Sequence, residues 1–123
     1  MSGAAMIINF EIPADDLERA QAFYSGLFGW EIKEVSGRKD YFTITSTSEN
    51  SVGGGLIKRF RPQETIINYI DVPSIDEYSA RVEALGGKIV VQKKPVRGSG
   101  YFVICRDTEN NTFGMWEENT DAQ

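Results

Sequence analysis

The sequence predicts an α+β fold made of two βαβββ modules in tandem, because its second half repeats its first. Residues 8–30 read as a strand, a helix and the start of a second strand, and a degraded copy begins at Ile67. Two further matches lie 60 residues apart: Tyr41-Phe42 with Tyr101-Phe102, and Gly54 with Gly114. A module of about 55 residues leaves one face of its sheet uncovered. We therefore expect a single domain, residues 1–123, in which the two modules pair.

The first module, residues 6–59, is predicted to open with a strand over residues 6–12. Alternation along this strand places Asn9 and Glu11 on one face and apolar side chains on the other. Pro13 is predicted to end the strand, since proline lacks the N–H that a ladder requires. A polar residue inside an otherwise apolar strand makes Asn9 the first candidate for function.

A helix is predicted after this strand. Asp15 is the expected N-cap, and Glu18 three residues later would complete a capping box. Apolar residues then recur at spacings of three and four, and Gly29 marks the helix end. The remaining strands of the module are predicted over residues 30–35, 40–46 and 52–59.

The second module, residues 65–117, repeats this order. A strand is predicted over residues 65–72, and Ser74 with Glu77 forms a second capping box before a helix that stops at Gly86. Further strands are expected over residues 88–92, 100–106 and 112–117, with a loop over residues 93–100.

Composition excludes several classes of function. No apolar run approaches the roughly 20 residues of a membrane span, and the N-terminus lacks the basic and apolar regions of a secretory signal. A net charge of −5 argues against nucleic-acid binding, which needs a basic face. A single cysteine, Cys105, forms no internal disulfide, which suits the cytoplasm. The chain has no histidine, the commonest side chain for metal binding and proton transfer near neutral pH.

Several segments together resemble the vicinal oxygen chelate superfamily, which holds glyoxalase I, the bleomycin-resistance proteins and the extradiol dioxygenases. They are Phe10-Glu11-Ile12-Pro13-Ala14-Asp15-Asp16, Phe23-Tyr24, Phe28-Gly29-Trp30, Gly100-Tyr101-Phe102 and Asp107-Thr108-Glu109-Asn110-Asn111. The resemblance implies the glyoxalase/bleomycin-resistance/dioxygenase fold: tandem βαβββ modules that form a curved mixed sheet with two outer helices. It also implies a homodimer, as in most members, and a ligand site in the concave sheet.

Enzymes of this superfamily hold a divalent metal at four inward-facing strand positions. The resemblance carries these positions onto Asn9, Gly54, Ile67 and Gly114, with Tyr69 or Asn68 replacing Ile67 if the register slips. Zinc, nickel and iron sites need imidazole, thiolate or carboxylate donors. The four residues supply at most one neutral oxygen, so we expect no metal and no cofactor.

Other residues offer a ligand site or acid–base chemistry. Glu11 and Asp71 stand near corresponding strand ends and would form an inward acid–base pair, unless both are solvated at the rim. The amide of Asn9 would bind a ligand or be satisfied by backbone. Glycine at positions 54 and 114 would leave space where a metal and its ligands stand. The aromatic residues that would wall this space, unless they belong to the core, are Trp30, Tyr41, Tyr69, Tyr101 and Trp116.

The sequence therefore favours a metal-independent protein that binds a small organic molecule in the concave sheet. One alternative is a lyase or isomerase of the glyoxalase-related class, with displaced metal ligands or with acid–base chemistry at Glu11 and Asp71. Another is an interaction module whose cleft is filled by side chains.

Overall fold

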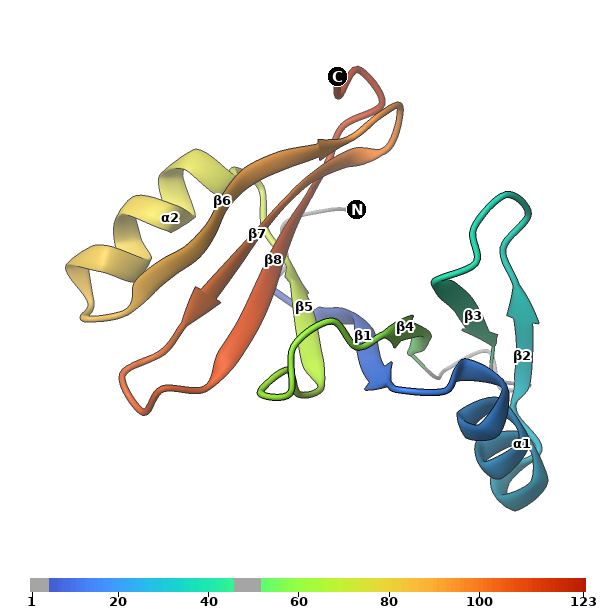
Figure 1. Ribbon diagram of the computed structural model, residues 1–123. Coiled ribbons are helices and arrows are strands. Elements are labelled where there is room, and N and C mark those ends of the chain that lie inside the picture. The colour runs from blue at the N-terminus through green and yellow to red at the C-terminus, as the bar shows by residue number, and fades with distance from the viewer. Residues whose placement is uncertain (1–4, 46–51) are drawn as a thin grey trace. The chain divides into compact units, whose positions relative to one another are not determined.

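The computed structural model describes residues 5–45 and 52–123 (Figure 1). The chain forms two compact units, one of residues 9–67 and one of residues 68–123 with the N-terminal segment that ends at Ile8. Elements follow one another as β-α-β-β-β and then again as β-α-β-β-β. The predicted α+β class and the tandem repeat are confirmed.

The first unit is a mixed four-stranded sheet in the order β2-β3-β4-β1, with α1 against one face. β1 and β4 run parallel, and the other neighbours are antiparallel. Its elements are β1 (Ile7–Ala14), α1 (Leu17–Phe28), β2 (Glu31–Glu34), β3 (Tyr41–Thr45) and β4 (Gly53–Lys58). Ser46 of the third predicted strand and the loop predicted over residues 47–51 lie outside the described residues.

The second unit repeats this order as β5-β8-β7-β6, with β5 and β8 parallel. Its elements are β5 (Ile67–Asp71), α2 (Ile75–Ala84), β6 (Lys88–Val96), β7 (Gly100–Arg106) and β8 (Thr112–Glu118). The start of the chain pairs with β5 inside this unit: the N–H of Asp71 donates to the carbonyl of Met6, and the N–H of Ala5 donates to the carbonyl of Asp71, both at 2.9 Å.

The first helix begins one residue later than predicted. β1 continues through Pro13, because the ladder bond to the chain after β4 is made by Ala14, whose carbonyl accepts from the N–H of Arg59 at 2.9 Å. Asp16 is therefore the N-cap, and its carboxylate accepts from the N–H of Arg19 at 2.9 Å. The prediction of Asp15 as the cap, with its capping box, is wrong.

The other helix ends follow the prediction closely. Gly29 ends α1 in the left-handed conformation, with φ of 72°, which glycine adopts without strain. Ser74 caps α2, and its hydroxyl accepts from the N–H of Glu77 at 3.1 Å.

β6 is longer than predicted, because it includes the first half of the segment assigned to a loop, residues 93–96. Register shifts fall between Ile89 and Val91 and again between Val91 and Lys94. Such irregularities break the alternation of apolar and polar residues by which a strand is recognised in sequence.

Each unit has its own core between sheet and helix. In the first unit the buried residues are Ile12, Ala14, Leu17, Ile32, Phe42, Ile44 and Leu56. In the second unit they are Val72, Ile75, Val103, Cys105 and Met115. Among the described residues, the longest helix is too short to cross a membrane.

Candidate functional site

The face of the first sheet opposite α1 carries the residues singled out in β1. Phe10 and Phe42 pack on the α1 side, so the alternation of side chains along a strand puts their neighbours on the other side. We call this surface the helix-free face of the first unit; it consists of Asn9, Glu11, Tyr41, Thr43, Gly53 and Gly55. The prediction that Asn9 and Glu11 share one face agrees with this register.

Tyr41 lies across Gly55 on this face. A Cβ atom added to Gly55 would collide with the hydroxyl oxygen and ring carbons of Tyr41. Glycine at this position therefore allows the ring to lie against the backbone of β4, where no other residue leaves enough room. In the ladder, Gly55 is the partner of Glu11 in β1 and of Thr43 in β3.

The Tyr41 hydroxyl joins Asn9 and Glu11 in one hydrogen-bonded cluster. Burial of the hydroxyl is the largest cause that raises the pKa of Tyr41 to about 12, and the negative charge of Glu11 adds to it. The hydrogen bond to Glu11 also raises this pKa, as expected when the hydroxyl donates to the carboxylate, whereas the hydrogen bond with Asn9 lowers it. Tyr41 is therefore a neutral hydrogen-bonding group near pH 7.

Arg38 borders this cluster. Its guanidinium carbon lies 4.8 Å from the centroid of the Tyr41 ring, and a guanidinium nitrogen pairs with Asp40 at 3.3 Å. The site thus combines an aromatic ring, an amide, a carboxylate and a nearby cation on one side of a four-stranded sheet.

The helix-free face of the second unit is more apolar. It carries Tyr69 and Asp71 of β5, with the ladder partners Gly114 and Trp116 of β8. Phe102 and Ile104 of β7 continue the same face. The ring of Tyr69 covers Gly114 as Tyr41 covers Gly55, since a Cβ added to Gly114 would collide with that ring.

The expected free space beside the two predicted glycines is not present. Gly54 faces α1, and a Cβ added there would meet the carbonyl oxygen of Phe10 at 2.6 Å and its ring at 2.7 Å. The space beside Gly114 is taken by Tyr69. Gly54 and Gly114 therefore leave no room for a ligand, contrary to the prediction, and the glycine that lies under a tyrosine in the first unit is Gly55.

Trp30 and Tyr101 lie on the helix sides of their sheets. They therefore pack on the cores, which was the stated alternative to a place in the ligand wall. Trp30 stacks on Tyr24 of α1, with ring centroids 5.5 Å apart and planes at 11°. Tyr101 packs on the core of the second unit, and the ammonium nitrogen of Lys93 lies 4.4 Å from its ring centroid.

The ladder register explains why Tyr101 does not repeat Tyr41. Gly55 neighbours Thr43 in β3, and Gly114, its counterpart, neighbours Ile104 in β7. Tyr41 lies two residues before Thr43 in β3, and Phe102 lies two residues before Ile104 in β7. Phe102 is therefore the counterpart of Tyr41. The match at a spacing of 60 residues was therefore one residue out of register, which reverses the face.

The two candidate acid–base residues belong to different units. Glu11 is half-buried and hydrogen-bonded to Tyr41, and its ladder counterpart in the second unit is Tyr69, since each is the partner of a covered glycine. Asp71 is only 6% exposed. The expectation that Glu11 and Asp71 occupy corresponding positions is therefore wrong.

The residues at the family metal positions do not fit a divalent metal. Asn9 offers one neutral amide oxygen, and the other three positions, Gly54, Ile67 and Gly114, offer no side-chain donor. Within residues 5–45 and 52–123, no three His, Cys, Asp or Glu side chains form a group that could hold a metal. The donor set thus gives no basis for a metal-dependent step.

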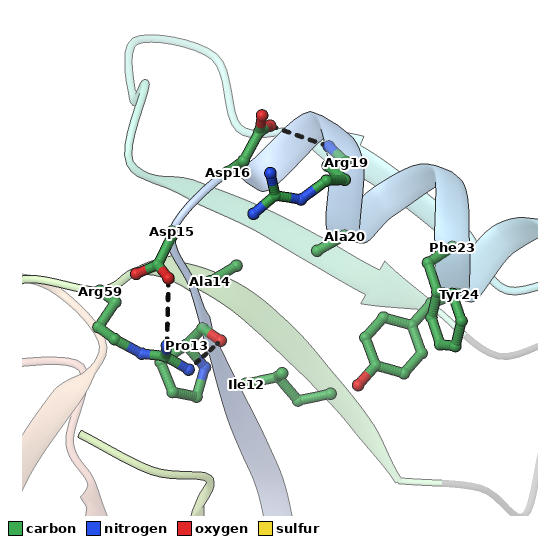
Figure 2. Close-up of a pocket in the computed structure, with 10 residues that line it drawn as sticks. All are labelled: Ile12, Pro13, Ala14, Asp15, Asp16, Arg19, Ala20, Phe23, Tyr24 and Arg59. Carbon is green, nitrogen blue, oxygen red and sulfur yellow. Dashed lines mark hydrogen bonds and ion pairs between the residues drawn. The ribbon is translucent and has the colours of Figure 1, made fainter. Parts of the chain in front are cut away.

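A pocket that the sequence did not reveal lies in the first unit, beside the start of α1 (Figure 2). Its volume is about 410 Å³, within the range of small-molecule sites. Its lining residues are Ile12, Pro13, Ala14, Asp15, Asp16, Arg19, Ala20, Phe23, Tyr24 and Arg59. We call it the α1 pocket.

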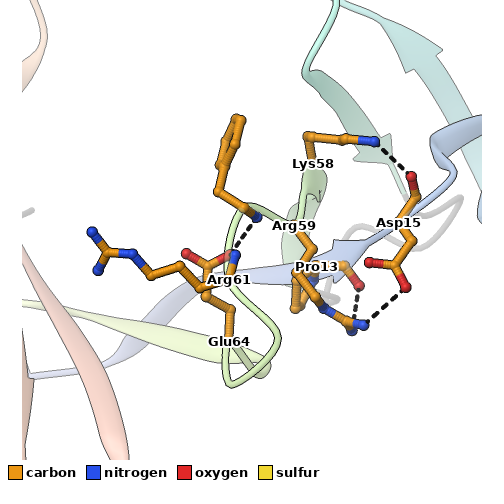
Figure 3. Close-up of polar contacts among 7 residues, drawn as sticks. Pro13, Asp15, Lys58, Arg59, Arg61 and Glu64 are labelled. Carbon is orange, nitrogen blue, oxygen red and sulfur yellow. Dashed lines mark hydrogen bonds and ion pairs between the residues drawn. The ribbon is translucent and has the colours of Figure 1, made fainter.

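Arg59 links two chain segments in the wall of the α1 pocket by hydrogen bonds (Figure 3). Its guanidinium donates to the carboxylate of Asp15 at 3.4 Å and to the carbonyl of Pro13 at 3.3 Å. Lys58 adds a bond from its ammonium group to the carbonyl of Asp15 at 2.7 Å. These contacts hold the chain between β1 and α1 against the chain that follows β4.

Comparison with known proteins connects this chain to one superfamily. The family model for the bleomycin resistance protein-like N-terminal region matches residues 6–46. A glyoxylase-like domain-containing protein of Didymella fabae is 31% identical, and the match covers 89% of this chain and 91% of that protein. The anthracycline biosynthesis protein DnrV of Streptomyces peucetius is 25% identical over 89% of this chain. This chain spans about half of that relative, 46% of its length.

The fold comparison agrees. A glyoxalase/bleomycin resistance protein/dioxygenase superfamily member from Vibrio splendidus 12B01 superimposes with a TM-score of 0.69 at 16% identity, covering 94% of this chain and all of that one. The repeated βαβββ order and the match to the Didymella fabae protein together show that the chain belongs to the glyoxalase/bleomycin resistance/dioxygenase superfamily, also called the vicinal oxygen chelate superfamily.

Proposed function

We propose that this protein binds a small organic molecule without a metal, through the helix-free face of the first unit. The observation that supports the proposal is the cluster in which Tyr41, lying over Gly55, is hydrogen-bonded to Asn9 and Glu11. Ligand sites in proteins combine apolar or aromatic surface with a few placed polar groups. Asn9, Glu11 and the edge of Tyr41 supply both donors and acceptors, and Arg38 adds a positive charge at the border.

The ligand that suits this surface is a flat or heterocyclic molecule with hydrogen-bonding groups. The ring of Tyr41 offers a stacking surface, and the amide of Asn9 pairs with carbonyl and amine groups equally well. The name of the Streptomyces peucetius relative connects that protein to anthracyclines, which are polycyclic and aromatic. An anthracycline is therefore a reasonable first probe for this chain.

The experiment uses a fluorescent anthracycline and protein stripped of metals with a chelator. Fluorescence titration should give the same dissociation constant before and after stripping, and the melting temperature should not change. Asn9→Ala should weaken binding by about 1–3 kcal/mol, because a ligand group loses its partner. Gly26→Ala is the matched control, since a Cβ at Gly26 meets no atom within 4 Å. Binding that needs added metal would overturn the proposal.

A second candidate function is a metal-free lyase or isomerase reaction in which Glu11 accepts a proton. The observation that favours it is the hydrogen bond to Glu11 from the Tyr41 hydroxyl on the helix-free face, where a bound molecule would meet the carboxylate. Glu11→Gln separates the two functions. In a binding protein this variant only changes affinity, whereas in an enzyme it removes turnover and leaves a bound, unconverted substrate.

A homodimer is the assembly we propose, on the same family resemblance. Sedimentation at micromolar concentration should give twice the monomer mass of 13.8 kDa. A monomeric mass at that concentration would contradict this part of the proposal.

A further inference from the structure

The α1 pocket lies on the opposite side of the first sheet from the helix-free face. Ile12, Ala14 and Ala20 pack with the core between the sheet and α1, and all three line the pocket. It is therefore separate from the surface that carries Asn9, Glu11 and Tyr41, and the proposed function does not use it.

The pocket exists because two alanines stand where the second unit has larger side chains. The helix caps Asp16 and Ser74 are 58 residues apart, and the same spacing matches Ala14 with Val72 and Ala20 with Tyr78. Val72 is 1% exposed and Tyr78 packs on the second core. The second unit thus fills the volume that the first unit leaves open.

Aromatic rings form the apolar wall of the pocket. Tyr24 and Phe23 line it, with ring centroids 5.2 Å apart and planes nearly perpendicular. Phe23 is 60% exposed, so its ring is available to a bound molecule at the mouth of the pocket. Tyr24 continues inward to Trp30, on which it stacks.

Two aspartates and two arginines line the pocket, so the charge left for a ligand depends on which of them are paired. The carboxylate of Asp15 is paired with Arg59, and that of Asp16 accepts from the backbone at the start of α1. The guanidinium of Arg19 forms no ion pair or hydrogen bond with any residue that the structure describes. Figure 2 shows its side chain lying along the first turn of α1, beside the pocket. Both acids are thus engaged, while one cation is not.

We propose that the α1 pocket is a second binding site, for a small aromatic molecule that carries one negatively charged group. The rings of Phe23 and Tyr24 contact the aromatic body of the ligand, and Ala20 forms the floor. Arg19 binds the anionic group, since a guanidinium offers several donors in one plane to a carboxylate or sulfonate.

The test uses 8-anilinonaphthalene-1-sulfonate, an aromatic anion whose fluorescence rises when it is bound, and N-phenyl-1-naphthylamine, which has the same rings without the charge. Ala20→Tyr introduces the side chain found in the second unit and should abolish binding of both probes. Ala22→Tyr, on an exposed position of the same helix, is the matched control and should bind both as the parent does. Parent-like binding of either probe by Ala20→Tyr would overturn the proposal.

Arg19→Gln tests the charge and changes only an exposed residue, so it remains informative if Ala20→Tyr fails to fold. It should weaken sulfonate binding roughly fivefold and leave binding of the neutral probe unchanged. Arg61→Gln, an exposed arginine outside the pocket, should change neither. Equal sulfonate affinity in Arg19→Gln and Arg61→Gln would also overturn the proposal.

Discussion

The two units share one architecture but differ in what lies on their helix-free faces. Each has a covered glycine, Gly55 under Tyr41 and Gly114 under Tyr69. Around the first ring the neighbours are polar, Asn9 and Glu11. In the second unit the face continues with Phe102, Ile104 and Trp116. The repeated feature is therefore a tyrosine packed on a glycine. The first unit differs in the polar neighbours of that tyrosine, Asn9 and Glu11, whereas the charged residue on the second face is Asp71.

On the helix sides of the sheets, side chains are more closely packed in the second unit than in the first. At the start of α2 the carboxylate of Glu117 accepts from the N–H of Ile75 at 2.8 Å, and Ile75 is 1% exposed. At the start of α1 small side chains leave the α1 pocket. A duplicated module can thus keep its fold while one copy fills its volume and the other retains space for a ligand.

The largest expected effect comes from adding a side chain under either tyrosine. Gly55→Ala and Gly114→Ala should each lower the free energy of unfolding by about 1–3 kcal/mol, because the ring above must move. Gly26→Ala should instead raise it by about 0.5–1 kcal/mol, as expected inside a helix. Urea denaturation measures all three. If Gly55→Ala left stability unchanged, Tyr41 would not be held against β4.

Removing the Tyr41 hydroxyl is expected to cost less. Tyr41→Phe should lower the free energy of unfolding by about 1 kcal/mol, because Asn9 and Glu11 lose a partner in a half-buried position. Tyr24→Phe is the control, since the Tyr24 hydroxyl makes no hydrogen bond with a described residue. An equal effect of the two variants, measured by urea denaturation, would argue against the cluster.

Titration of Tyr41 tests the same cluster. Its pKa of about 12 in the folded protein lies above the ordinary value of 10.0, so this group stabilises the fold fully below pH 10. That contribution is lost as the pH rises from 10 to 12. Glu11→Gln should lower the pKa of Tyr41, and Asn9→Ala should raise it. The titration of Tyr41 is followed by tyrosinate absorbance, from which the signal of the Tyr41→Phe variant is subtracted. An unchanged pKa of Tyr41 in Glu11→Gln would contradict the hydrogen bond between Tyr41 and Glu11.

Losses of about 1 kcal/mol or less are expected at the start of each helix. Asp16→Ala should lower the free energy of unfolding by about 1 kcal/mol, whereas Ser74→Ala should cost less, because Glu117 still accepts a bond at the start of α2. Asp15→Ala removes only an exposed ion pair with Arg59 and should cost less than about 1 kcal/mol. Thermal denaturation measures the stability of both variants. A larger loss of stability in Asp15→Ala than in Asp16→Ala would support Asp15 as the N-cap, as predicted from the sequence.

Periodicity and turn residues were sufficient to predict the fold and its repeat. Proline and acidic residues near position 15 placed the first helix to within one residue, but two adjacent aspartates could not show which one caps it. The register of β7 could not be read from the sequence, because a match of two aromatic residues tolerates a shift of one. That shift moved Tyr101 from the predicted ligand wall to the helix side.

The candidate site was predicted in part. Asn9, Glu11 and Tyr41 were all candidates from the sequence, and alternation in β1 puts the first two on one face. Their contact with Tyr41 could not be predicted, because only the ladder register brings that residue of β3 over Gly55. The α1 pocket was missed because a cavity arises from what side chains fail to fill. Its trace in the sequence is the pairing of Ala14 with Val72 and of Ala20 with Tyr78 at the spacing of the helix caps.

The most direct test of the central claim is the dissociation constant of metal-stripped protein for a fluorescent anthracycline, compared between the parent and Asn9→Ala. We predict that the stripped parent binds and that Asn9→Ala binds roughly 5- to 150-fold more weakly, which corresponds to about 1–3 kcal/mol. Gly26→Ala should match the parent. A stripped parent that does not bind, or Asn9→Ala binding as tightly as the parent, would contradict metal-independent recognition at the helix-free face of the first unit.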